Sequence, residues 1–72
     1  MNLSDLKSIV DLAENASEGD DPSAQAIKIE TNKFKDKVRD VMGKSYDKLT
    51  KKDLIPKSIA DAADDLRKAY GS

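Results

Sequence analysis

The side chains of this 72-residue sequence that could carry chemistry are carboxylates, lysines, hydroxyls and two tyrosines, because it contains no His and no Cys. Without imidazole or thiolate groups, the usual zinc sites and the Ser/His/Asp and Cys/His catalytic arrangements cannot be built. The adjacent carboxylates Asp20-Asp21 and Asp64-Asp65 are poorly placed to share a proton, since neighbouring residues on a helix point about 100° apart. We therefore expect no catalytic residue, no metal site and no cofactor, and we expect the protein not to be an enzyme.

Two short segments match ligand-binding motifs only in part. Gly43-Lys44-Ser45 resembles the end of the phosphate-binding loop G-x-x-x-x-G-K-S, but Val38 stands where the first glycine is needed. No strand is expected before it either. The acidic residues between Glu14 and Asp21 lack the alternating spacing, the glycine and the distal glutamate of an EF-hand calcium loop. Neither segment predicts a ligand site.

The segment from Lys44 to Lys57 contains five lysines around Tyr46 and is the strongest candidate for binding a charged partner. Lysines in such a set could contact nucleic-acid phosphates. The segment contains no Arg, Asn or Gln, however, which are the residue types that read base edges best. The pI of about 5.3 is also far below that of a typical nucleic-acid-binding domain. Nucleic acid is therefore the second-ranked partner, after another protein.

Several apolar residues lie outside the helical stripes described below. Exposed together, Ile29, Leu49, Leu54 and Ile55 would form an interaction patch. The alternative, which we favour, is that Leu49, Leu54 and Ile55 fold back and cap the bundle. The residues predicted to bind a partner are Ile29, Lys33, Arg39, Tyr46, Lys48, Leu49, Lys51, Lys52, Leu54 and Ile55.

The predicted partner-binding residues must be positioned by helices. Apolar residues recur at helical spacing in three segments: 3–16, 22–42 and 57–70. The central one begins with Asp21-Pro22, a capping residue followed by a proline that suits the first helical position, and it ends before Gly43. Its predicted seam is Ala24, Ile27, Thr31, Phe34, Val38 and Val41. A hairpin over 27–37 is the alternative, but no Asn-Gly or Asp-Gly turn supports it.

The outer segments have recognisable ends as well. Asn2 or Ser4 can cap the first helix, and Gly71 is expected to close the last. The sequence Thr50-Lys51-Lys52-Asp53 has the form of a capping box and predicts a short helical turn starting at Lys51 and stopped by Pro56. The fold class predicted is all-α: a small three-helix bundle in one domain, 1–72, with an antiparallel first helical hairpin and an optional short fourth helical turn.

The charges favour packing of the first helix beside the central one. Residues 1–27 carry one lysine and six acidic residues, net −5, whereas 28–57 carry ten basic and five acidic residues, net +5. Lys28, Lys35 and Lys37 flank the central seam, so they would repel in a parallel self-dimer, and an acidic first helix would relieve them. Ion pairs of this kind select an arrangement rather than hold it together.

These observations predict a small regulatory protein that acts through a partner. We expect a non-enzymatic protein–protein interaction module, such as an inhibitor, adaptor or assembly subunit. The alternative is a nucleic-acid-associated regulator that uses the basic residues of 44–57. No apolar run reaches the length of a membrane span, so we expect no membrane contact and a cytoplasmic location. A chain this short has a small core, and it is predicted to be a monomer or a homodimer.

Overall fold

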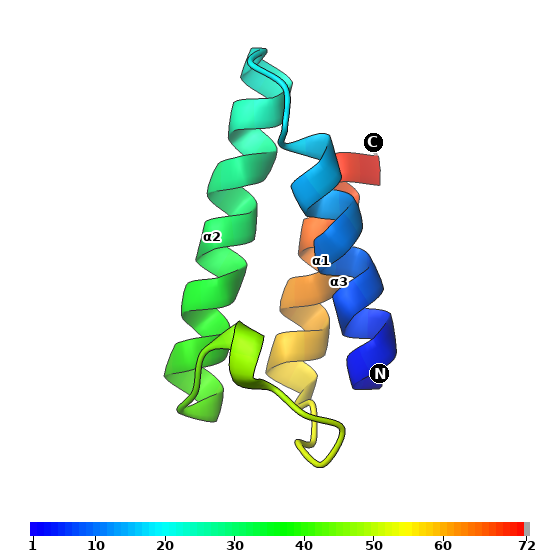
Figure 1. Cartoon of the computed structure of the whole chain (residues 1–72), viewed down its shortest axis with the longest axis vertical. Coiled ribbons are helices and arrows are strands. Elements are labelled where there is room, and N and C mark those ends of the chain that lie inside the picture. The colour runs from blue at the N-terminus through cyan, green and yellow to red at the C-terminus, as the bar shows by residue number, and fades with distance from the viewer. Residues whose placement is uncertain (72) are drawn as a thin grey trace.

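The computed structural model describes residues 1–71 and forms a bundle of three α-helices joined by short loops. The elements are α1 (Leu3–Ala16), α2 (Pro22–Met42), the short 3₁₀ helix η1 (Tyr46–Lys48) and α3 (Lys57–Gly71). Figure 1 shows α2 running antiparallel to α1, and α3 running back in the direction of α1. The predicted all-α three-helix bundle with an antiparallel first hairpin is confirmed. The alternative hairpin over 27–37 is replaced by continuous helix.

The start of α1 and both ends of α2 lie where local capping chemistry places them. Asn2, rather than Ser4, caps α1, because its Oδ1 accepts from the backbone N–H of Asp5 at 2.8 Å. Asp21 Oδ1 accepts from the N–H of Ala24 at 2.8 Å, with Pro22 in the first position of α2. Gly43 ends α2 with a φ of 75°, in the left-handed region.

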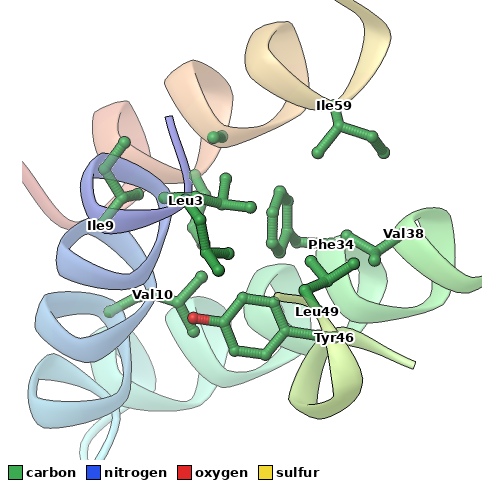
Figure 2. Close-up of a cluster of buried hydrophobic side chains, with 12 residues drawn as sticks. Leu3, Ile9, Val10, Phe34, Val38, Tyr46, Leu49 and Ile59 are labelled. Carbon is green, nitrogen blue, oxygen red and sulfur yellow. The ribbon is translucent and has the colours of Figure 1, made fainter. Parts of the chain in front are cut away.

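A single cluster of buried apolar side chains joins all the elements. It contains twelve residues, drawn as sticks in Figure 2: Leu3, Leu6, Ile9, Val10, Ala13, Phe34, Val38, Tyr46, Leu49, Ile59, Ala63 and Leu66. Tyr46 and Leu49 come from η1 and the residue after it, so the chain beyond Gly43 contributes to the core as well as connecting two helices. Ile55 is half-buried and packs against the same cluster.

One member of the predicted α2 seam was wrong. Ala24, Thr31, Phe34 and Val38 are buried and Ile27 is half-buried, but Val41 is 46% exposed. A straight helix drifts by about 20° for each seven residues relative to a strict heptad, so the stripe has turned away from the core by its last member. Thr31, the polar member, is accommodated because its hydroxyl donates to the carbonyl of Ile27 at 2.8 Å.

The predicted helical turn at Lys51 was also wrong, and the short helical turn forms earlier, at Tyr46–Lys48. The Thr50 and Asp53 pair does form, but it closes a tight turn in which the N–H of Asp53 donates to the carbonyl of Thr50 at 3.0 Å. Pro56 lies three residues beyond this turn and α3 begins immediately after it, so no room is left for a helix before it.

Replacing Gly43 by alanine should destabilise the fold by about 1–2 kcal/mol, the cost of holding a Cβ-bearing residue in the left-handed region. An added Cβ would meet no atom within 4 Å, so the loss comes from backbone strain alone. Urea unfolding followed by circular dichroism measures it.

Gly19→Ala is the matched control, because its Cβ would make an ordinary 3.5 Å contact with the Ala24 side chain at a position without positive φ. We expect it to change stability by less than about 0.5 kcal/mol. Equal losses in the two variants would contradict this account of the helix end.

Candidate functional site

The loop between η1 and α3 is organised by the carboxylate of Asp53. One oxygen, Oδ2, accepts from the backbone N–H of Thr50 at 2.8 Å and from its hydroxyl at 3.3 Å. The other, Oδ1, accepts from Lys44 Nζ at 2.9 Å. The Lys44 ammonium and the Thr50 N–H hold the pKa of this carboxyl below its ordinary value. The carboxylate therefore fastens the middle of the loop to Lys44, the second residue beyond the end of α2.

Leu54 follows this fastening point and is 90% exposed. Its neighbours point elsewhere, since Asp53 is tied to Lys44 and Thr50 and Ile55 packs against the core. The leucine is thus held outward from both sides. Of the large apolar side chains described, it has the highest exposed fraction, ahead of Ile29 at 55% and Leu12 at 54%.

Exposed lysines flank Leu54 in the sequence, two in the loop before it and one at the nearer end of each neighbouring helix. Lys48, Lys51, Lys52 and Lys57 are all exposed, and we call these four residues together with Leu54 the Leu54 surface. Lys44 forms an ion pair with Asp53, and its ammonium group neutralises the negative charge of Asp53 on the loop. The surface therefore combines one apolar side chain with a basic surround.

The fold adds a residue that sequence reasoning missed. A hollow of about 320 Å³ lies between the start of α1 and the loop, lined by Leu3, Ser4, Lys7, Leu49, Thr50 and Lys51. The two leucines are buried, and Lys7 and Lys51 are exposed. Lys7 thus joins the basic side of the loop although it is more than forty residues away in sequence. No local pattern could have identified it.

The predicted partner-binding residues are not gathered in one place. Tyr46 and Leu49 are core residues, 8% and 4% exposed, and Ile55 is half-buried. The prediction that these residues fold back to cap the bundle is thus confirmed for Leu49 and Ile55 and wrong for Leu54.

The predicted residues on α2 lie apart from the loop. Ile29 is exposed but lies about 20 Å along α2 from Gly43, so it does not form a joint patch with Leu54. Lys33 and Arg39 are exposed on α2.

Tyr46 anchors η1 to α1 and α2. Its ring meets Phe34 edge-on, with centroids 6.2 Å apart, and Lys35 Nζ lies 5.8 Å from its centroid. The same ammonium donates to Glu14 Oε1 at 2.8 Å, which realises one of the predicted pairings between acidic α1 and basic α2. Because it is buried, Tyr46 is not available as an aromatic platform for a nucleic-acid base.

Burial and the nearby carboxylates of Asp11, Glu14 and Asp47 raise the pKa of Tyr46 to about 12. Each of these effects penalises the phenolate, burial by withholding water and the carboxylates by repulsion. The raised pKa therefore keeps Tyr46 protonated well above neutral pH.

No family model, curated protein or solved structure matches this chain. Within residues 1–71, no group of three acidic side chains is arranged to hold a metal ion. In the same range, no helix is both long and apolar enough to cross a membrane. The geometry of the surface is therefore the basis for a functional proposal.

The raised pKa of Tyr46 predicts a loss of stability in alkali. The unfolded chain releases this phenolic proton near pH 10 and the folded chain near pH 12, so the stability is fully present below pH 10 and falls between these values. We expect the tyrosinate absorbance of a Tyr70→Phe variant, in which Tyr46 is the remaining tyrosine, to titrate about two pH units higher than in denaturant. Matching titrations in the folded and unfolded protein would contradict the buried position.

Removing the Asp53 carboxylate should release the loop. We expect Asp53→Asn to raise the rate of limited tryptic cleavage after Lys51 and Lys52 several-fold, because the ion pair to Lys44 is lost. Mass spectrometry of the fragments over time measures the rate of this cleavage. Asp47→Asn, an exposed neighbour on η1, is the matched control and should leave the rate unchanged.

The contact of the Asp53 carboxylate with Lys44 and Thr50 should be lost in acid. Because the folded pKa of Asp53 is lowered, this contact persists below the ordinary carboxyl pKa of 3.8 and is lost as the pH falls through the lower value. A carboxyl NMR titration that placed the pKa of Asp53 at or above the ordinary value would contradict the contact with Lys44.

Proposed function

We propose that this protein is a non-enzymatic protein–protein interaction module that engages its partner through the Leu54 surface. The observation that supports it best is the 90% exposure of a leucine on a loop fastened by Asp53. A held loop loses little conformational freedom on binding, so more of the interaction energy is available for affinity. An inhibitor, adaptor or assembly subunit would all use such a surface.

The chemistry of the Leu54 surface indicates what the partner should present. Full burial of a leucine side chain contributes about 1.5–3 kcal/mol, which makes Leu54 the natural anchor for an apolar pocket. Lys48, Lys51, Lys52 and Lys57 favour an acidic rim around that pocket. Exposed charges of this kind contribute mainly to the rate of association and to the choice of partner.

Nucleic acid is the second candidate, supported by the four exposed lysines of the Leu54 surface and by Lys7 beside them. Against it, Lys44 is occupied by Asp53 and Tyr46 is buried, so neither a full row of cations nor a stacking aromatic is offered. Phosphate contacts alone would give weak binding with a steep salt dependence.

We expect the protein to act in the cytoplasm whether its partner is a protein or a nucleic acid, which fractionation of cells expressing it would test.

Leu54→Asp should weaken partner binding about tenfold or more, because it removes the apolar anchor and places a carboxylate beside the partner's acidic rim. Cross-linking in cell extract followed by mass spectrometry identifies the partner, and titration of the purified pair measures the affinity. Ile29→Asp is the matched control, an exposed apolar residue on α2 away from the loop, and should bind like the wild type.

A second measurement separates the two candidates. We expect no anisotropy change with labelled DNA or RNA at about 50 mM salt, where phosphate contacts are strongest. Binding that is lost in Lys51→Ala/Lys52→Ala and retained in Leu54→Asp would favour nucleic acid over a protein partner.

A further inference from the structure

The groove between α2 and α3 forms an open face of the bundle. Two hollows, of about 370 and 340 Å³, follow one another along it and share Glu30. All the residues that line them belong to α2 or α3, and none to α1. The groove therefore runs on the side of this helix pair that α1 does not cover.

The two walls of the larger hollow carry opposite charges. Lys33 and Lys37 line it from α2 together with one acidic residue, Glu30, whereas Asp61 and Asp65 line it from α3, each pair four residues apart on its helix. All four side chains are exposed. No ion pair connects the two walls in the described part of the chain, and Lys33 instead contacts Glu30 on its own helix at 3.6 Å. The charges thus lie at the same height but remain apart across the groove.

The floor between these walls is apolar and made of side chains that are small or at least partly buried. Phe34, Ala62 and Leu66 form it in the larger hollow, and Ile27 and Ala69 continue it in the smaller one. Small residues on a helix face allow another helix to approach closely.

We propose that two copies of this chain pack through their α2–α3 faces, related by a two-fold axis parallel to the helices. This rotation lays α2 of each copy over α3 of the other. It places Lys33 and Lys37 opposite Asp61 and Asp65 of the second copy, because both rows lie at one height in the monomer. Each set of contacts forms twice in a dimer of this symmetry.

The charges distinguish this arrangement from the other two-fold dimer of the same face. An axis perpendicular to the helices and centred on the larger hollow would set lysines against lysines and aspartates against aspartates. Exposed pairs contribute only about 0–1 kcal/mol each, so they choose the arrangement, while the partly exposed apolar side chains of the groove, Ile27, Ala62 and Ala69, supply the attraction. The dimer with an axis parallel to the helices also avoids the repulsion between lysines that a dimer through α2 alone would cause.

The size of the face suits a modest dimer. The bundle is 36 Å long and 18 Å wide, so even a whole face is somewhat smaller than the roughly 800 Å² that each partner buries in a standard interface. The floor is rich in alanine, and we therefore expect association in the micromolar range rather than an obligate dimer. The proposal does not rest on the Leu54 surface, and a Leu54→Asp variant should dimerise like the wild type.

Charge exchange between the two walls tests the proposal. Lys33→Glu/Lys37→Glu and Asp61→Lys/Asp65→Lys should each weaken self-association at least tenfold in sedimentation equilibrium, because each sets like charges across the interface. An equimolar mixture of the two variants should recover a dimer, since every wall then faces its opposite. Carbodiimide cross-linking of mixed normal and isotope-labelled wild-type protein should join Lys33 or Lys37 of one copy to Asp61 or Asp65 of the other.

Three results would overturn the proposal. One is a wild-type chain that stays monomeric up to millimolar concentration. Another is a mixture of the two variants that stays monomeric while the wild type dimerises and circular dichroism shows all of them folded. The third is loss of the dimer in Leu12→Asp, which alters the separate groove between α1 and α3 and should leave self-association unchanged.

Discussion

A shortage of large apolar side chains is the constraint on which the rest of this structure depends. Eight of the apolar residues are alanines, and α3 contributes only Ile59, Ala63 and Leu66 to the buried cluster. The three helices supply ten of the twelve residues of the buried cluster, and two of these ten are alanines. The chain after Gly43 turns back, and Tyr46 and Leu49 complete the cluster beside Phe34 (Figure 2). The connection between α2 and α3 is thus part of the core.

The exposure of Leu54 follows from this use of the connection. Leu49 before it and Ile55 after it pack on the bundle, and the residues between them must close a tight turn, which Asp53 stabilises. A turn this short leaves no path inward for Leu54. Single exposed apolar residues are common on proteins, so exposure alone says little. Leu54 differs from Leu12 and Ile29 because it projects from a fastened loop among lysines.

The parts of the fold that depend on local chemistry could be predicted from the sequence. The start of α1 and both ends of α2 follow from Asn2, Asp21 and Gly43, which act on backbone groups within a few residues of themselves. The predictions that were wrong or missing concern features that depend on how the helices pack. Val41 continues the seam by spacing but is turned outward by helix drift, and the exposure of Leu54 is decided by the burial of its neighbours. The position of Lys7 beside the loop depends on how α1 packs, which no short motif encodes.

The direction of the proposed two-fold axis links the two surfaces. An axis parallel to the helices keeps both copies pointing the same way, so both Leu54 surfaces lie at the same end of the dimer. A perpendicular axis would instead place them at opposite ends. Two anchors on one end can engage a partner that has two matching pockets, and the second contact then forms at a high effective concentration. Weak self-association would in that case strengthen partner binding without any new contact, because the groove between α2 and α3 leaves the loop free.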